Sequence, residues 1–176
     1  MRPTPTPADP DAWNAYLAEG NARQARKRVA ADVLLQDASG RVLLVNPTYK
    51  PGWDLPGGMA EANEAPEDAV TRELVEELGL RVTVRGLLVV DWVAPHGPWD
   101  DQIAFIFNGG TLAPDQAARL TPQDDELAEA AFLPPDAALD RLADRIRPRY
   151  TAALHALADG HTRYLRNGEV PNSRRL

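Results

Sequence analysis

The sequence predicts one domain of the α/β or α+β class, with strands and helices interleaved around a sheet. Short runs rich in valine, leucine and isoleucine, typical of buried strands, alternate with a stretch that has the period of an amphipathic helix. With 176 residues, the chain suffices for one domain with a core but not for two ordinary ones. The expected boundaries are a flexible lead at 1–10, the domain at 11–165 and a tail at 166–176.

The expected elements follow from apolar runs and from their boundary residues. A short helix is expected at 10–20, because proline favours the first helical position and glycine often ends a helix. Three prolines and three glycines make 47–58 an irregular loop. Strands are expected at 29–36, 41–46, 81–93 and 102–110, and two late helices at 135–146 and 148–158.

Composition and charge limit the kinds of partner. The chain has no cysteine, which excludes disulfides, thiolate zinc sites and cysteine nucleophiles. The formal net charge of -7 disfavours broad binding to nucleic acid or to an anionic membrane, and no arginine-rich surface favours RNA. No apolar run reaches the roughly 20 residues of a membrane span, and the N-terminus lacks the apolar stretch of a signal peptide. We therefore expect a cytoplasmic protein whose small anionic partners bind through a cation.

One predicted helix carries three glutamates on one side. Proline at its start, acids in its first turn and Gly79 at its end predict a helix over Pro66–Leu78. At about 100° of rotation per residue, its three glutamates share an arc of roughly 100° beside the apolar stripe. These glutamates are Glu73, Glu76 and Glu77.

The clustered glutamates suggest a site for hard divalent cations. Like charges at this spacing oppose the helix unless something positive lies between them. Mg²⁺ and Mn²⁺ prefer carboxylate oxygens, and the preceding Leu55-Pro56-Gly57-Gly58 turn can direct a backbone carbonyl toward the same ion. Taken alone, the clustered glutamates also fit a solvated helix face, and the Pro-Gly-Gly sequence also fits an ordinary turn.

The joint spacing of these residues resembles the signature of the Nudix hydrolase family. Residues 58–80 read GMAEANEAPEDAVTRELVEELGL, which fits the pattern G-x5-E-x7-R-E-U-x-E-E-x-G-U at every position, U being a bulky aliphatic residue. An accidental match of this length is expected on the order of once in 10⁸ to 10⁹ starting positions. The resemblance reaches more loosely over about residues 28–133.

The resemblance implies a fold, a reaction and a cofactor. The fold is an α/β/α sandwich around a mixed β-sheet, with the N-terminal helix and the C-terminal helices as additions. The reaction is Mg²⁺-dependent hydrolysis, with Mn²⁺ as a substitute, of a diphosphate bond in a small nucleotide-like substrate. A nucleotide-sensing module that binds without cutting is the alternative from another class. Relatives are often dimers, so a homodimer is one open oligomeric state.

The resemblance also implies roles for individual residues. Glu73, Glu76, Glu77 and the carbonyl of Gly57 are the expected metal ligands, and the three glutamates are expected to serve catalysis. Two or more ions held there would polarise phosphorus and activate a water. Arg72 is expected at the substrate site, where its guanidinium would orient a glutamate. Glu64 is expected to be structural.

The sequence also offers candidates for the general base and for substrate contacts. Glu126, in the acidic run at 124–126, is our candidate general base, and a solvated acidic turn is the alternative. Aromatic side chains can stack on a nucleobase, although packing is the commoner fate of tryptophan. The candidate substrate contacts are Tyr49, Trp53 and His96, with Trp92 and Trp99 as further stacking candidates.

Overall fold

A computed structural model describes residues 4–171 of the chain. The first three residues of the expected lead and the last five of the expected tail lie outside the described residues. Every helix within 4–171 is too short or too polar to span a lipid bilayer.

The described residues contain five helices and seven strands. The strands are β1 (Arg28–Gln36), β2 (Val42–Pro47), β3 (Gly57–Met59), β4 (Leu87–Val93), β5 (Gln102–Thr111), β6 (Leu127–Leu133) and β7 (Arg163–Arg166). The helices are α1 (Pro10–Ala22), α2 (Pro66–Leu78), α3 (Pro114–Ala118), α4 (Pro135–Arg141) and α5 (Arg147–Asp159).

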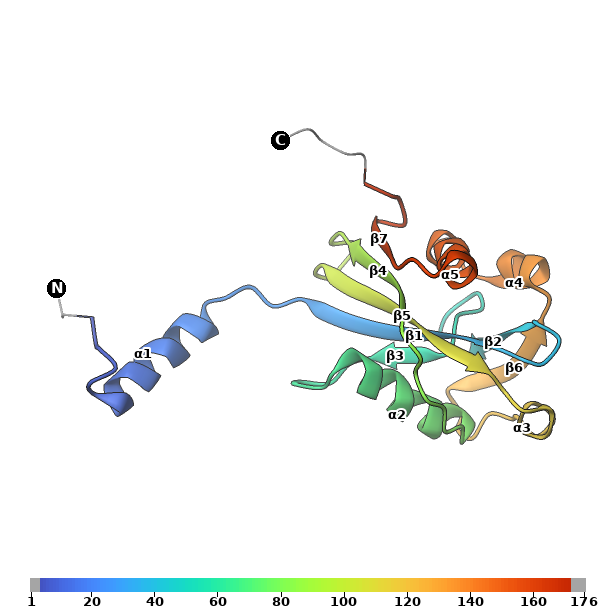
Figure 1. The fold of residues 1–176 in the computed structure, drawn as a ribbon, viewed down its shortest axis with the longest axis horizontal. Coiled ribbons are helices and arrows are strands. Elements are labelled where there is room, and N and C mark those ends of the chain that lie inside the picture. The colour runs from blue at the N-terminus through green and yellow to red at the C-terminus, as the bar shows by residue number, and fades with distance from the viewer. Residues whose placement is uncertain (1–3, 172–176) are drawn as a thin grey trace.

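All seven strands belong to one mixed sheet. Its order is β6-β2-β1-β5-β4-β7, and the short β3 pairs with β1 off this path. β1 runs parallel to β5 and β4 runs parallel to β7, whereas the other pairs are antiparallel. The long β1–β5 pairing therefore joins segments that are far apart in sequence at the centre of the sheet (Figure 1).

Helices cover both faces of the sheet, which confirms the expected α/β/α sandwich. α2 and the segment around α3 enclose one apolar cluster, built around Val33, Leu43 and Leu74. α4 and α5 enclose the other, built around Leu34 and Tyr150. Figure 1 shows these two helical layers on opposite sides of the sheet.

The N-terminal helix α1 stands apart from this body (Figure 1). It begins at Pro10, as predicted, and the Asp9 side chain caps it by accepting a hydrogen bond from the Ala12 amide at 3.1 Å. None of its residues is buried. The extra N-terminal helix is therefore confirmed as an addition to the sandwich.

Two expected elements are shorter than predicted. The strand expected at 81–93 begins only at Leu87, because Gly86 adopts a φ of +151° that breaks the regular strand. The helix expected at 135–146 ends at Arg141, because Leu142 turns to extended backbone and forms a parallel bridge with Trp53.

Candidate functional site

The packing of helix α2 against the sheet places its glutamates near the core. Its apolar side chains Val70, Leu74 and Leu78 pack beneath the sheet. Gly79, with a φ of +62°, ends the helix by donating its amide to the carbonyls of the last turn. Glu77 lies between Leu74 and Leu78 in sequence, and its side chain therefore lies at the edge of the core.

Glu77 is a buried carboxylate that forms no ion pair within residues 4–171. The residue is only 6% exposed, and its Oε2 atom has no hydrogen-bond partner among the described residues. Burial, and after it the carboxylates of Glu73, Asp124 and Glu126, together raise the pKa of Glu77 to about 8, while Lys50 opposes them. The ionised form of Glu77 is therefore disfavoured by its surroundings.

Glu73 lies one turn earlier and is held in place from two sides. Its Oε1 accepts a hydrogen bond from Arg72 Nη1 at 3.0 Å. Its carboxylate also lies so close to Gly58 that a Cβ on Gly58 would overlap it. Burial raises the pKa of Glu73, and Arg72 opposes this shift. Because glycine has no side chain, Gly58 leaves room for the Glu73 carboxylate.

Arg72 is fully engaged within the protein. Nε and Nη2 donate to the two oxygens of Glu64 at 2.9 and 3.0 Å, and Nη2 also donates to the Met59 carbonyl at 3.1 Å. Nη1 donates to Glu73 at 3.0 Å and to Glu76 at 2.9 Å. These bonds occupy all five N–H groups of the guanidinium. Arg72 therefore orients glutamates and has no donor left for a substrate.

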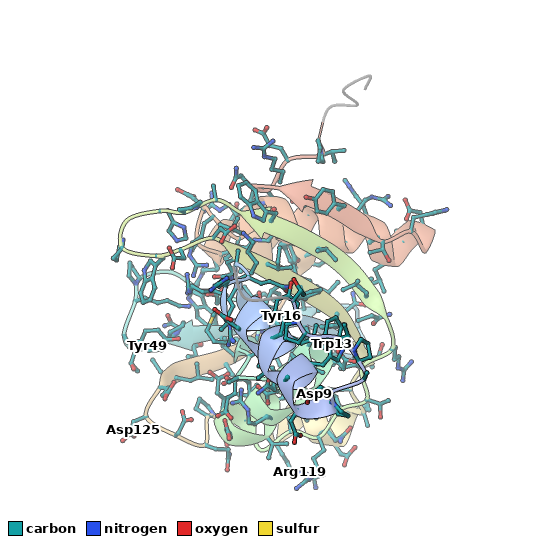
Figure 2. All side chains as sticks on the ribbon, turned by 90° about the vertical axis from the view of Figure 1, so that its left-hand side faces the viewer. Asp9, Trp13, Tyr16, Tyr49, Arg119 and Asp125 are labelled. Carbon is teal, nitrogen blue, oxygen red and sulfur yellow. The ribbon has the colours of Figure 1, made fainter. Side chains whose placement is uncertain are left out.

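A cavity of about 910 Å³ opens beside these glutamates. Glu126, from the turn before β6, lies in the same wall, because Thr48 on the neighbouring loop donates its amide to the Glu126 carbonyl at 2.8 Å. Figure 2 shows the tips of these two loops, at Tyr49 and Asp125, on one side of the molecule. We call the wall the glutamate shelf: it comprises Gly57, Gly58, Glu73, Glu77 and Glu126.

Glu76 and two tryptophans do not reach the cavity lining. The Glu76 side chain is 56% exposed and bonds to Arg72 beside the shelf. Trp53 is buried in the core next to Leu142 and lies outside the cavity lining, so the expected contact between Trp53 and the substrate stays a prediction without support from this geometry. The Trp92 indole N–H donates to Asp101 at 3.0 Å, outside the cavity.

Three other candidates do line the cavity. Tyr49 is exposed on the loop after β2, and Trp99 is exposed on the loop between β4 and β5. His96 pairs with Trp99 through two backbone hydrogen bonds of 3.0 Å. The Arg28 guanidinium lies over the Trp99 ring, 4.5 Å from its centroid. The sequence thus identified part of an aromatic rim, although it did not distinguish rim from core.

The shelf fits a divalent cation by its chemistry. Carboxylate oxygens suit Mg²⁺ and Mn²⁺, and the unpartnered oxygen of Glu77 beside Glu73 and Glu126 lacks a positive partner. Within residues 4–171, however, no three acidic or imidazole side chains already converge as a metal cluster. The fit therefore rests on the donor set rather than on a preformed coordination sphere.

Comparison with known proteins assigns the chain to a family. A family model described as the NUDIX domain matches residues 26–154, which is more than two thirds of the chain. The chain belongs to the Nudix hydrolase family. The Nudix match spans the sheet from β1 to β6 together with α2 and most of α5, and it ends before β7.

Individual Nudix relatives support this assignment. A MutT-like protein of Streptomyces ambofaciens is 33% identical over 126 residues, which are 72% of this chain and 75% of that protein. An 8-oxo-dGTP diphosphatase of Proteus vulgaris is 56% identical over 46 residues, 26% of this chain and 39% of that protein. The crystal structure of a Nudix hydrolase from Nitrosomonas europaea superposes with a TM-score of 0.64 at 22% identity, covering 82% of this chain and 80% of that one.

Sequence reasoning missed several charged residues of this Nudix cavity. Asp32 on β1 and Asp54 on the loop before β3 both line it, and Lys50 bridges to Asp54 at 2.7 Å. Burial and the neighbouring Asp54 raise the pKa of Asp32 to about 7. A lone aspartate inside the apolar run VAADVLLQ was the one available signal, because a charge in a buried strand needs a reason.

We expect Arg72→Lys to lower kcat about 10- to 100-fold while the domain stays folded. Lysine keeps the charge but cannot hold Glu64, Glu73 and Glu76 at once, because it lacks the planar fork of arginine. Steady-state kinetics and circular dichroism check this. An unchanged kcat would show that the glutamates do not need this anchor.

Proposed function

We propose that this Nudix protein is a metal-dependent pyrophosphohydrolase that cleaves the diphosphate bond of a nucleoside diphosphate linked to a second group, by attack of water on phosphorus. The observation that carries the proposal is Glu77, a buried carboxylate without a hydrogen-bond donor that lies with Glu73 and Glu126 in the wall of a large cavity. Such crowding of acids suits a cation that a diphosphate can share.

Mg²⁺, with Mn²⁺ as a substitute, is the cofactor that we propose for the glutamate shelf. When bound, such an ion supplies a Lewis acid for the phosphate oxygens and lowers the pKa of a bound water. Glu73, Glu77 and the Gly57 carbonyl are the proposed ligands in the cavity wall. Glu76, which shares Arg72 with Glu73, remains a predicted ligand from beside the shelf.

Glu126 is the proposed general base. It lines the cavity, it is exposed, and its carboxylate forms no ion pair with any residue from 4 to 171. A free carboxylate next to Glu73 and Glu77 can accept the proton of the attacking water. The half-buried Arg72 holds Glu73 in position while this proton moves.

The size and rim of the cavity favour a substrate with a bulky group on each side of its diphosphate. Its volume of about 910 Å³ lies at the upper end of the usual range for ligand pockets, roughly 300–1,000 Å³. Tyr49 and Trp99 at the rim offer aromatic faces for a nucleobase. His96 next to Trp99 is placed to contact the same group.

A substrate panel tests this function. It includes ADP-ribose, NADH, nucleotide sugars, diadenosine polyphosphates and nucleoside triphosphates with 8-oxo-dGTP among them, and it measures the nucleotide products by chromatography without a coupling enzyme. We expect hydrolysis of nucleoside diphosphate conjugates with Mg²⁺ or Mn²⁺ at alkaline pH, and a fall of at least about 100-fold in EDTA. Binding without turnover would favour the sensing module, and turnover that survives EDTA would remove the metal from the proposal.

A further inference from the structure

The cavity continues past the glutamate shelf into a second part built by the C-terminal elements. Its wall there includes Asp91 of β4, Arg149 of α5 and Asn167 after β7, and we call these three residues the inner chamber. Figure 1 shows β4, β7 and α5 side by side at this end of the sheet. Asn167 lies beyond the segment that matches the Nudix family, whereas Asp91 and Arg149 lie within it.

Arg149 and Asp91 form a buried ion pair with donors left over. The two residues are only 5% and 1% exposed, and Nε of Arg149 lies 3.3 Å from Oδ2 of Asp91. This Nε nevertheless forms no hydrogen bond among the described residues. Within residues 4–171 the guanidinium donates one hydrogen bond, from Nη2 to the Arg145 carbonyl, at a long 3.4 Å. A buried guanidinium with unmet donors is costly unless a ligand completes it.

Asp91 and Asn167 supply the matching polar atoms. Both oxygens of Asp91 accept a hydrogen bond from the Gly168 amide, at 3.1 and 3.2 Å, and this fixes the carboxylate in the wall. Oδ1 of Asn167 accepts from the Ala94 amide at 2.7 Å, which leaves the Asn167 side-chain N–H groups as further donors. The chamber therefore offers an acceptor and several donors close together.

The charges around the inner chamber cancel above about pH 7. Asp54 pairs with Lys50 at 2.7 Å and with Arg145 at 2.9 Å, and Asp91 pairs with Arg149 at 3.3 Å. Asp32, whose pKa is about 7, adds the third negative charge against these three cations once it is ionised. Asp144 also reaches the lining, but its side chain is 94% exposed and pairs with Arg147. A further phosphate would find no spare positive charge, whereas hydroxyl and amide groups would find partners.

We propose that the inner chamber binds an uncharged, hydrogen-bonding group of the substrate, a sugar ring or a nucleobase, on the far side of the diphosphate from the glutamate shelf. Arg149 and Asn167 donate hydrogen bonds to this group and Asp91 accepts one from it. This inference rests on the proposed function, and it makes Asp91, Arg149 and Asn167 specificity residues of the same cavity.

The test measures binding and turnover with two series of ligands. The sugar series is ADP-glucose, ADP-ribose and the β-methyl ester of ADP; the base series is ADP-, GDP- and UDP-glucose. We expect Arg149→Lys to weaken the best ligand of one series on the order of tenfold, chiefly in KM and in calorimetric Kd, because bonds to a charged group are lost. The series whose spread collapses identifies the group in the chamber.

Controls separate a local effect from a general one. Arg147→Lys changes an arginine on the same helix that lies outside the cavity lining and pairs with the exposed Asp144, and it should leave both series unchanged. If Arg149→Lys does not fold, Asn167→Ala serves as the second variant, with an expected loss of a few-fold in the same series.

Three results would overturn the inference. One is that folded Arg149→Lys and Asn167→Ala proteins keep every affinity and both spreads. Another is that Arg149→Lys weakens ATP more than any sugar nucleotide, which would make the chamber an anion site. The third is that wild type shows no spread in either series, so that it binds the methyl ester of ADP as tightly as every conjugate and does not distinguish ADP-, GDP- and UDP-glucose. Calorimetry gives these answers without turnover, so they stay distinct from a failure of the proposed hydrolysis.

Discussion

Glu77→Gln is expected to lower kcat by about 1,000-fold or more while the domain stays folded. Glutamine keeps the shape of the side chain but removes the charge that we propose for holding the cation, and electrostatic groups of this kind commonly contribute factors of about 10² to 10³ or more. The matched control is Glu67→Gln, in the exposed first turn of the same helix, which should keep wild-type kcat. Equal kcat in wild type and Glu77→Gln would remove Glu77 from the site.

The same variant also tests the crowding of acids around Glu77. Because the pKa of Glu77 rises from 4.5 to about 8 on folding, ionisation of this group opposes the metal-free fold. The opposition is absent below about pH 4.5, grows between pH 4.5 and about 8, and is constant above that. In EDTA at pH 8 we expect Glu77→Gln to melt several degrees above wild type, at roughly 2–4 °C per kcal/mol for a domain of this size. At pH 4 the two melting temperatures should coincide.

Gly57→Ala is expected to cause the largest loss of stability, on the order of 3 kcal/mol or more. Gly57 has a φ of +140°, and a Cβ there would overlap the Ala31 carbonyl oxygen and lie 2.7 Å from Asp32 Cα. Both atoms belong to the backbone of β1, which the sheet holds in place. Urea denaturation followed by circular dichroism measures this loss.

Gly58→Ala separates the fold from the site. A Cβ on Gly58 would overlap the carboxylate of Glu73, which is the far end of a flexible side chain and can turn away. We therefore expect a fall in kcat that is large compared with any shift in the denaturation midpoint. Wild-type stability in Gly57→Ala, or a wild-type kcat in Gly58→Ala, would contradict the packing described around these two glycines.

Local signals account for the elements that could be predicted. The boundaries of α2 follow from proline at its start and Gly79 at its end, and both act within one turn of the chain. The segment Gly57–Met59 forms β3 although it has no strand pattern, because β1 offers it a partner. β7 likewise depends on its parallel pairing with β4, which sequence periodicity does not reveal.

The residues of the candidate site also fall into those that local sequence signals predict and those that depend on the tertiary fold. Glu73 and Glu77 could be placed from helix geometry, since both positions lie beside the apolar stripe of one helix. Asp32, Asp91 and Arg149 could not, because only the pairing of β1, β5 and β4 and the packing of α5 bring them to one cavity. No feature of the sequence around Trp53 indicated whether its side chain lies in the core or at the rim of the cavity. In the fold this side chain is buried in the core.

The central claim, that the glutamate shelf holds a divalent cation, is tested most directly by calorimetric titration of the metal-free protein with Mn²⁺ at pH 7 in two buffers of different ionisation enthalpy. We predict that wild type binds Mn²⁺ with release of close to one proton, because Glu77 with a pKa of about 8 must ionise, and that Glu77→Gln loses at least about tenfold in affinity together with this proton release. Equal Mn²⁺ affinity and equal proton release in wild type, Glu77→Gln and Glu67→Gln would contradict it.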